Sequence, residues 1–482
     1  MKIQKVLLMS LPAVVKKGDT YLDDGHSFHL GLAYIGGLMR EKGYEVRILD
    51  CFAERPDQLR KEPDQDEWLE RGLSDQEIIE TVAGFEPDLI GMTIPFSCQH
   101  YLGHAIGGKI KQHFPEIPIV AGGNHVTAVP EEIDPVIFDY RVVGEGEFTF
   151  LGIAEALNQD KNLAEVPGIF GISKVEQAYI EDLDALPYPA IDLLPLQKLW
   201  KTGKRWIIMV ASRGCMYNCV FCSIHTTLGY KIRRRSVDNV VAEIRHWKDL
   251  YQVEEVYFED DNLTTYASWA KELLRRIADE KFGIRFYVRN GIRADSIDRE
   301  LLVLMKKAGF QDFMIAPESG SQRILDEVIG KKMTLEASLK AVELATQVGL
   351  GVNTFFVIGL PQETRDDMQA TFDFARQLKQ KGCAGFWIST ATPYPGTRLF
   401  TYCVEKGLID PATMDYRHLR TVDYLIQNDN ISPQEIVAFR EEMMKELAPP
   451  PHTRLAQLKN GIMLLLKDPA FFWTKLRYQL NK

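Results

Sequence analysis

Long hydrophobic runs, a surplus of basic residues and a disulfide-like set of cysteines are all missing from this sequence. No apolar stretch approaches the roughly 18 residues that a membrane-spanning helix needs, so the sequence predicts no transmembrane span. The 57 lysines and arginines are outnumbered by 67 aspartates and glutamates, which argues against a nucleic-acid partner bound mainly through its phosphates. The apolar run near the N-terminus is too short for the core of a signal peptide, so we predict no targeting segment and a cytoplasmic location.

The composition is otherwise that of ordinary globular proteins. Hydrophobic residues make up 45% of the chain and charged residues 26%, values that exclude disordered and collagen-like classes. A chain of 482 residues exceeds what one hydrophobic core usually organises, so at least two domains are predicted.

The few cysteines are unevenly placed. Of the seven, Cys215, Cys219 and Cys222 fall within eight residues, in the segment SRGCMYNCVFCS. Without a secretion signal, such crowding is typical of a metal site and not of a disulfide framework. Three soft thiolates on a short loop can bind three irons of a cubane iron–sulfur cluster and leave the fourth iron open. Zinc stays open as the alternative, although structural zinc normally takes four protein ligands and His225 is the only close further candidate.

Residues 1–160 alternate short β-branched runs with helical patterns. Five predicted strands separated by helices indicate an α/β domain built on a doubly wound parallel sheet. In such sheets ligands lie outside the carboxyl ends of the strands, where glycine lets a ligand approach the backbone closely. Small or polar residues follow the predicted strands at Gly91, Thr93, Gly122, Gly123, Asn124, Gly144, Glu145 and Gly146.

The rest of the chain predicts a linker, a barrel and a tail. Residues 161–201 contain several prolines and break the alternation, so we interpret them as a linker. Six βα units between residues 202 and 400 predict an incomplete (β/α)6 barrel with its site at the carboxyl ends of the strands. Residues 401–482 are predicted to form a small helical region. Its basic, aromatic tail from Arg454 onward either contacts an anionic membrane surface or packs on the barrel, and we favour packing.

A short basic run, Arg233–Arg235, follows the cysteine loop. Such a run is usually solvated, and contact of one arginine with an acidic substrate or a cofactor carboxylate is the alternative.

The CxxxCxxC spacing directly after the first barrel strand, with Phe221 just before the third cysteine, resembles the radical S-adenosylmethionine (SAM) superfamily. Further segments resemble its cobalamin-binding branch, which includes class B methylases and the anaerobic magnesium-protoporphyrin cyclase. The resemblance covers nearly the whole chain up to about Phe400. The segments that carry it are YFEDDNLT, APESGSQRILDEVIGKKMT, FFVIGLPQET and PYPGTRLF in the second half, and HLGLAYIGGLMREKGYEVRILD, AGGNHVTAVPEE and VVGEGEFTF in the first.

The resemblance implies three cofactors: a [4Fe-4S] cluster held by the three cysteines, SAM on the open iron, and cobalamin on the N-terminal sheet. It implies that Glu318 lies near the amino or ribose groups of SAM. It assigns no catalytic residue. The other residues that it places at the cofactors are Phe221, Asp260, Ser319 and Gly359 in the barrel, together with Gly31 and the strand-end residues from Gly91 to Gly146 in the N-terminal domain. Gly359 is equally well explained as a residue that turns the chain after a strand.

A familiar cobalamin signature, Asp-x-His-x-x-Gly, is absent from the chain. The nearest segment is Asp24-Gly25-His26, and His29 stands where glycine would be needed. The resemblance therefore implies cobalt without a protein histidine below it. An N-terminal domain that binds a flavin or nucleotide, or that has lost its ligand, is the alternative.

The function that the resemblance implies is methylation of an unactivated carbon through a 5′-deoxyadenosyl radical and methylcobalamin. The implied substrate is a small molecule, a lipid or a pigment. Oxidative cyclisation or ring rearrangement with the same cofactors is one alternative, and a non-catalytic cobalamin or redox sensor is another. The expected partners are the substrate and an electron donor such as flavodoxin or ferredoxin, with membrane contact through the tail as an option. Because oxygen destroys such a cluster, we predict an anaerobic or oxygen-protected setting.

Overall fold

The computed structural model describes residues 2–16, 28–62, 65–200, 203–427 and 430–448. These residues form two compact units. The N-terminal unit spans Met1–Ile180 and Ala185–Gly203, and the C-terminal unit spans Glu181–Asp184 and Lys204–Pro451. Within the described ranges no helix has the length and apolarity to cross a membrane. The segment Asp24–His26 and the tail from Arg454 lie outside the described residues.

The N-terminal unit is built on a parallel sheet with the strand order β3-β1-β6-β7-β8 among the described residues. This order is that of a doubly wound, flavodoxin-like sheet, and it confirms the predicted fold class. The strands are β1 (Lys5–Met9), β3 (Glu45–Leu49), β6 (Leu89–Thr93), β7 (Ile119–Gly122) and β8 (Tyr140–Arg141).

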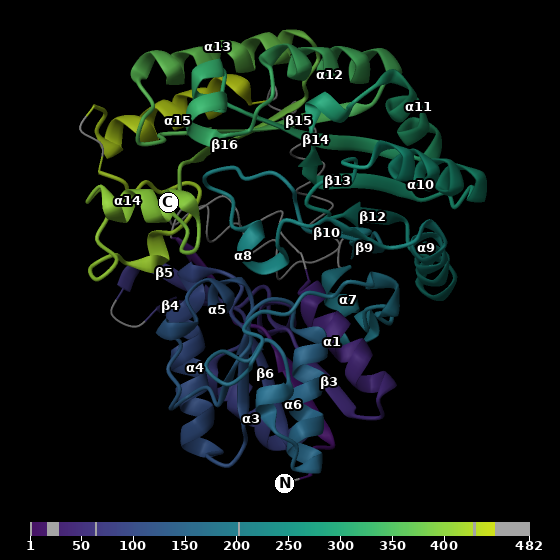
Figure 1. Cartoon of the computed structure of the whole chain (residues 1–482), viewed down its shortest axis with the longest axis vertical. Helices are drawn as coiled ribbons and strands as arrows, with labels where there is room; N and C mark the ends of the chain where they lie inside the picture. Colours follow the sequence, from purple (N-terminus) through teal and green to yellow (C-terminus); the bar gives the residue numbers. More distant parts are fainter. Residues whose placement is uncertain (1, 17–27, 63–64, 201–202, 428–429, 449–482) are drawn as a thin grey trace. The chain divides into compact units, whose positions relative to one another are not determined.

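Helices cover both faces of this sheet (Figure 1). On one face α1 and α6 pack together, and on the other α3 and α4 share a core with β1 and β6. The start of α3 is fixed by a capping box in which Ser74 and Glu77 each bond the other's backbone N–H. The helices of this unit are α1 (Leu30–Glu41), α2 (Cys51–Glu54), α3 (Asp75–Phe85), α4 (His100–His113), α5 (Asn124–Ala128), α6 (Glu147–Gln159) and α7 (Leu196–Leu199).

A small antiparallel sheet in this unit was not predicted. It consists of β2 (Ala13–Lys16), β5 (Gln65–Arg71) and β4 (Leu59–Glu62), with β5 in the middle. The sequence of β5, QDEWLER, carries mostly charged residues and lacks the β-branched pattern of a buried strand. Its Trp68 is nevertheless fully buried in the core beside Val14 and Leu73. One large apolar side chain therefore joins this sheet to the core.

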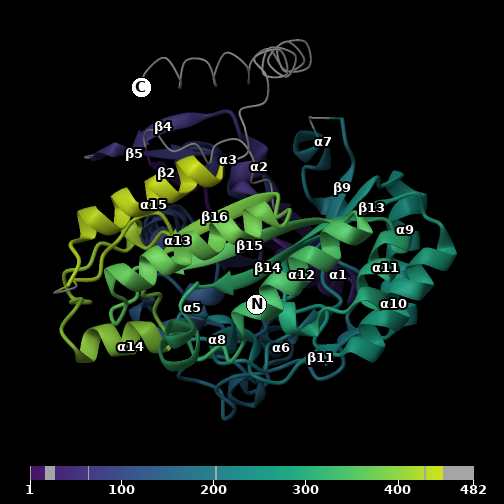
Figure 2. The same cartoon turned by 90° about the horizontal axis from the view of Figure 1, so that it is seen from above.

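The C-terminal unit holds a parallel sheet whose described strands run in the order β16-β15-β14-β13-β12-β9. Helices α9 to α13 cover its outer face (Figures 1 and 2), which confirms the predicted incomplete (β/α)6 barrel. The strands are β9 (Trp206–Met209), β12 (Glu255–Phe258), β13 (Arg285–Ile292), β14 (Phe310–Glu318), β15 (Gly351–Ile358) and β16 (Gly385–Thr390). The helices are α9 (Val237–Tyr251), α10 (Ala267–Glu280), α11 (Arg299–Ala308), α12 (Leu335–Val348) and α13 (Arg365–Gln380).

Smaller elements complete this unit. The strands β10 (Ser212–Arg213) and β11 (Arg233–Arg234) pair on either side of the cysteine loop and α8 (Ile224–Leu228). Two further helices, α14 (Arg398–Glu405) and α15 (Pro433–Leu447), follow the barrel. The expectation of a solvated Arg233–Arg235 run was wrong, because Arg233 and Arg235 are buried and Arg235 pairs with the buried Glu243 over 2.5 Å. Only Arg234 is exposed.

Candidate functional site

The cysteine loop follows β9 at the carboxyl edge of the barrel sheet. Gly214 enters it with a φ of +89°, and a Cβ there would lie 2.4 Å from the carbonyl oxygen of Lys231, so only glycine fits. The backbone N–H of Cys215 donates to the carbonyl of Gly229 at the end of α8, over 3.4 Å. The N–H of Val220 donates to the carbonyl of Ile329 over 3.0 Å. Backbone contacts thus fix both halves of the loop.

The three thiols of this loop are partly buried among charged groups. Burial raises the pKa of Cys215, of Cys219 and of Cys222, the last to about 12. The cations Lys331 and Arg293 act in the opposite direction and lower the pKa of Cys215 and Cys219. Without a metal the thiols therefore favour the protonated form, and the two cations lie where they offset the negative charge of bound thiolates.

The arrangement of these thiols bears on the kind of metal. In the described part of the chain, no three His, Cys, Asp or Glu side chains converge as the ligands of one metal ion do. The cysteines of a cubane each bind a different iron, and three thiols on one loop fit an iron–sulfur cluster with one open iron.

The buried carboxylate of Asp260 and the neighbouring Asp261 accept hydrogen bonds from the chain that enters the cysteine loop. Asp260 follows β12, is fully buried, and accepts hydrogen bonds from the backbone N–H of Ala211 over 3.1 Å and from the hydroxyl of Ser212 over 2.6 Å. Asp261 accepts from the N–H of Gly214 over 3.0 Å. Burial raises the pKa of Asp260 to about 6, against hydrogen bonds that lower it. Both side chains thus hold the chain that enters the cysteine loop.

Glu318 ends β14 at the same edge of the sheet. It has a φ of +68°, unusual for a residue with a side chain, and is buried. Lys331 donates from Nζ to its carboxylate over 2.8 Å, and Arg293 donates to the carbonyl of Lys331 over 3.1 Å. The next residue, Ser319, is also buried and exchanges a hydrogen bond with the hydroxyl of Thr371 over 3.1 Å. Glu318 therefore presents a carboxylate of fixed orientation.

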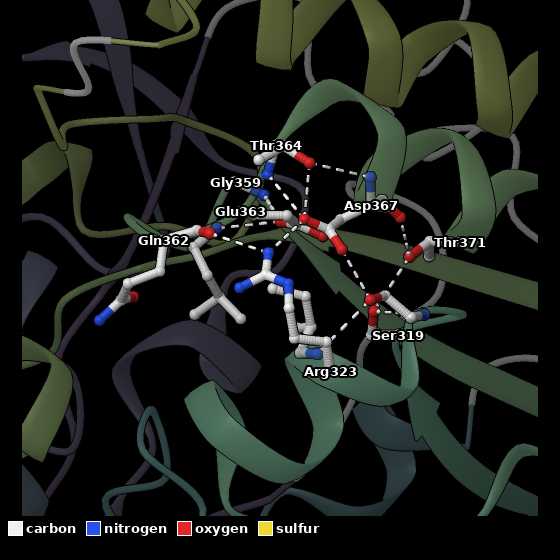
Figure 3. Close-up of polar contacts among 11 residues, drawn as sticks. Ser319, Arg323, Gly359, Gln362, Glu363, Thr364, Asp367 and Thr371 are labelled. Atoms are coloured by element: carbon white, nitrogen blue, oxygen red, sulfur yellow. Dashed lines mark hydrogen bonds and ion pairs between the residues drawn. The ribbon is translucent and has the colours of Figure 1, made fainter.

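A polar network anchors the segment after Ser319 to α13 (Figure 3). Its centre is Asp367, which accepts hydrogen bonds from the hydroxyls of Ser321 over 2.6 Å and Thr364 over 2.7 Å and pairs with Arg323. Burial opposes ionisation of Asp367, but these hydrogen bonds prevail and hold its pKa at about 2. The network fixes the chain that carries Glu318.

Gly359 lies in the same region but is enclosed by protein. Its N–H donates to Glu363 over 2.6 Å, and its carbonyl accepts from the hydroxyl of Tyr424 over 2.7 Å. A Cβ at this position would meet the ring of Tyr424 at 2.8 Å and Ile436 at 2.9 Å. These contacts account for glycine here through the turn after β15. Phe221 is half-buried within the cysteine loop.

In the N-terminal unit, a cavity of about 320 Å³ opens at the carboxyl edge of the sheet. His29, which precedes α1, also lines it. The predicted residues that it brings together are Gly31, Gly91, Thr93, Gly122, Gly123, Asn124 and Gly146.

The glycines that line this cavity fall into two groups: some are needed because a side chain would clash with the protein, and others border open space. A Cβ on Gly31 would meet nothing within 4 Å, and one on Gly122 would come no closer than 3.8 Å to Val142. A Cβ on Gly91 would lie 2.7 Å from the ring of Phe150, and Gly123 has a φ of +109° with the carbonyl of Ile94 at 2.8 Å. Packing therefore explains Gly91 and Gly123, whereas Gly31 and Gly122 leave open space that a ligand can fill.

Two predicted residues are not part of the cavity lining. Gly144 has a φ of +90°, and a Cβ there would lie 2.8 Å from the carbonyl of Ala178. Glu145 is buried and accepts a hydrogen bond from the N–H of Ile180 over 2.8 Å. Both residues instead contact the segment at Ala178 and Ile180 of the same unit.

Sequence reasoning missed Lys331, Arg293 and Glu363. Lys331 and Glu363 stand inside segments that carried the family resemblance, GKKMT and GLPQET, but nothing in either segment gives their partners. Arg293 and Glu363 come shortly after a strand end, where burial of a charge demands a partner, whereas Lys331 follows Ile324–Ile329 and has no such signal.

Comparisons with known proteins identify a family for each of the two units. A family model described as the radical SAM superfamily matches residues 209–375, and one described as the B12 binding domain matches residues 20–154. The cytidylyl-2-hydroxyethylphosphonate methyltransferase of Streptomyces wedmorensis is 31% identical, over 86% of this chain and 84% of its own. An uncharacterised methyltransferase of Pyrococcus horikoshii is 32% identical, over 90% of each chain. The anaerobic magnesium-protoporphyrin IX monomethyl ester cyclase of Rubrivivax gelatinosus is 26% identical, over 78% of this chain and 66% of its own.

Solved structures share the fold over almost the whole chain. The radical SAM methyltransferase TsrM from Kitasatospora setae superposes with a TM-score of 0.69 at 16% identity, over 93% of this chain and 90% of its own. The cobalamin-dependent SAM radical enzyme OxsB superposes with a TM-score of 0.72 at 18% identity, over 98% of this chain and 72% of its own. At these identities the likeness concerns the fold.

Proposed function

This chain belongs to the cobalamin-dependent radical SAM methyltransferase family, and on that premise we propose that it methylates an unactivated carbon atom of a small molecule. Its cofactors are a [4Fe-4S] cluster, SAM and cobalamin. When bound, they supply a 5′-deoxyadenosyl radical that removes a hydrogen atom and a methyl group that replaces it.

One observation carries the proposal. The same chain has a three-thiol loop at the carboxyl edge of one parallel sheet and an open, glycine-lined cavity at the carboxyl edge of another. A radical enzyme that uses no cobalamin needs only the first site. A cobalamin carrier without radical chemistry needs only the second. Retention of both fits an enzyme that joins the two chemistries.

We assign roles to the residues as follows. Cys215, Cys219 and Cys222 hold the cluster, while Lys331 offsets thiolate charge. Glu318 binds the amino or ribose groups of SAM through its oriented carboxylate.

Other predicted residues have supporting roles. Asp260 positions the loop through its three hydrogen bonds. In the N-terminal unit, Gly31 and Gly122 give the cofactor close access to the backbone.

The runner-up is oxidative cyclisation with the same cofactors, since a magnesium-protoporphyrin cyclase is among the relatives. Both reactions need an electron, for which we propose a reduced flavodoxin or ferredoxin as donor. Identity is higher to the methyltransferases, at 31% and 32%, than to the cyclase, at 26%. Methyl transfer is therefore the preferred proposal.

The deciding experiment uses SAM labelled in its methyl group with deuterium. The anaerobically reconstituted holoenzyme, a reductant and a metabolite extract of the source cells are combined, and products are followed by mass spectrometry. Methylation predicts a product that gains one trideuteromethyl group in place of hydrogen, with deoxyadenosine formed alongside. A product that loses hydrogen and carries no label would establish cyclisation instead.

Matched cysteine variants test the assignment of the loop. Cys219→Ala should abolish deoxyadenosine formation and lower iron content, because the cluster loses a ligand. Cys403→Ala changes a buried thiol outside the loop and should leave both intact. Equal iron content and activity in the two variants would refute the assignment.

A further inference from the structure

The barrel sheet presents two chemically different faces. Successive side chains of a strand point to opposite faces, and the rings of Phe286 and Phe310 stack 5.3 Å apart in the fully buried layer. Arg285, Tyr287 and Arg289 alternate with the buried residues of β13 and therefore share the opposite, inner face.

On this inner face, the charged and hydroxyl groups around Glu255 near the start of β12 and β13 pair with one another. Glu255 is buried and accepts hydrogen bonds from Arg285 over 2.8 Å, from Lys204 over 3.2 Å and from the hydroxyl of Tyr257 over 2.8 Å. The ring of Tyr257 stacks on that of Tyr287 at 4.7 Å and 16°. These contacts hold the two rings in place as a rigid aromatic platform.

Further along β13, Arg289 differs from Arg285, because its charge is not paired with a carboxylate of the described residues. The guanidinium of Arg289 lies 4.4 Å from the ring centre of Tyr257 and is exposed. Among the described residues it has no hydrogen bond and no ion pair within 4 Å. Glu259 and Asp312, from the two flanking strands, influence it only through longer-range electrostatic interaction. Arg285 of β13 is thus paired with Glu255, whereas no described residue occupies the N–H donors of Arg289, which are free to bind a ligand.

We propose that Arg289 anchors an oxyanion of the substrate, a carboxylate or a phosphonate-type group, with an unsaturated or apolar part resting on the aromatic side chains of the inner face. This inference deepens the proposed function, because it names the substrate class for the same barrel. A second aromatic pair, Phe355 on β15 and Trp387 on β16, has its ring centroids 6.1 Å apart. Trp387 is exposed, as a surface that receives a ligand must be.

The guanidinium is suited to this task. It is always charged, and its planar fork can donate two parallel hydrogen bonds to one oxyanion. Its contact with the ring of Tyr257 restricts the side chain before the ligand arrives, so less side-chain freedom is lost on binding. Removing it should weaken binding of an oxyanion by about 10- to 100-fold.

Proton uptake accompanies binding of an anion at this place. The pKa of Glu259 is raised to about 7, mainly by burial; the charge of Arg289 opposes this rise, and the charge of Asp260 contributes to it. Burial also raises the pKa of Asp312. An anion on Arg289 adds negative charge beside Glu259 and makes it hold its proton more strongly. Affinity for the anion should therefore rise as pH falls from 8 to 6.

The test measures ligand binding without turnover. Fluorine NMR of the reconstituted holoenzyme is recorded with four probes: 4-fluorobenzoate, 4-fluorophenylphosphonate, 4-fluorobenzylamine and 4-fluorotoluene. The wild-type enzyme should bind one or both anions more tightly than the amine and the neutral probe. The two anions distinguish a carboxylate from a phosphonate substrate. Tighter binding of the amine or equal binding of all four probes would overturn the proposal.

Variants locate the effect. Arg289→Met should weaken anion binding about 10- to 100-fold, while Arg275→Met, which removes an exposed arginine of α10, should leave it unchanged. Unaltered anion binding by Arg289→Met refutes the assignment. If that variant fails to retain its cluster, Arg289→Lys replaces it. Lysine keeps the charge without the fork, so it should preserve the preference for anions with weaker phosphonate binding, and loss of that preference would count against the proposal.

The pH arm uses 4-fluorobenzoate, which does not titrate near neutrality. Glu259→Gln should remove the rise in affinity between pH 8 and 6, and an unchanged slope would contradict the coupling to Glu259. Because no probe is methylated, these results stand whether the enzyme transfers methyl groups or closes rings.

Discussion

Lys331 donates from Nζ to a carboxylate oxygen of Glu318 over 2.8 Å, and both side chains are buried at the carboxyl edge of the barrel sheet. The same two charges act on the thiol of Cys219, Lys331 lowering its pKa and Glu318 raising it. One ion pair therefore borders both the cysteine loop and the position proposed for SAM. A change in Glu318 should affect SAM binding before it affects the cluster.

The first prediction concerns this carboxylate. Glu318→Gln keeps the shape of the side chain but removes its charge, so we expect iron content to stay as in the wild type. The KM for SAM in deoxyadenosine formation should rise by about 10- to 100-fold, because a charge-assisted hydrogen bond is lost. Glu327→Gln, in the π-helical segment Ile324–Ile329 nearby, serves as the matched control. Loss of iron together with SAM affinity would assign Glu318 to the loop instead.

The second prediction separates two glycines of the N-terminal cavity. Gly122→Val places its Cβ no closer than 3.8 Å to Val142, so it should cost less stability than Gly91→Val and should lower the cobalamin bound per chain. Gly91→Val forces a Cβ to within 2.7 Å of Phe150 and 2.8 Å of Leu8, and such overpacking should cost about 1–3 kcal/mol of stability. Visible spectra and thermal unfolding of both variants give the two readouts. Full cobalamin content in Gly122→Val would mean that the ligand lies elsewhere.

Both parallel sheets were predictable, because their strands are apolar runs separated by helical patterns and bounded by turn residues. Local pattern also located the cysteine loop. The antiparallel sheet was not predictable, since β5 is largely charged and only Trp68 ties it to the core. Pattern thus identifies strands that bury a whole face, and it misses a strand held by one side chain.

Contacts between residues far apart in the chain could not be predicted from local sequence patterns. Arg235 was expected in solvent, yet Glu243, two turns into the next helix, meets it in the interior. Gly144 and Glu145 stand after a strand like the cavity residues, but the segment at Ala178 and Ile180 returns to cover them. In both cases the environment of a residue depends on chain that comes back from elsewhere, which no local spacing encodes.

The third prediction concerns the lower face of cobalt. His29 lines the N-terminal cavity, so it is the described histidine best placed to test whether the protein supplies an axial ligand. Because the chain lacks the Asp-x-His-x-x-Gly signature, we expect none. The paramagnetic resonance spectrum of reduced, cobalamin-loaded enzyme should show no nitrogen splitting from a lower ligand and should be the same in His29→Ala. A splitting that disappears in the variant would establish His29 as a ligand.

The fourth prediction follows from Glu363, which is buried and accepts hydrogen bonds from the N–H groups of Gly359 and Leu360. Burial raises its pKa to about 8, against the two hydrogen bonds. The folded protein keeps this proton up to about pH 8, whereas the unfolded chain releases it near the ordinary value of 4.5. Between these values the folded state binds more protons, so stability falls as pH rises.

Glu363→Gln cannot titrate and retains an oxygen for the two backbone N–H groups. Between pH 6 and 8 the wild-type protein should therefore lose about 2 kcal/mol of stability relative to this variant. Urea unfolding of both proteins at the two pH values, under anaerobic conditions, measures the difference. Glu405→Gln, which changes an exposed glutamate on α14, controls for the loss of one charge and should follow the wild type. If the stability of Glu363→Gln and that of the wild type depend on pH in the same way, Glu363 is ionised in the folded protein.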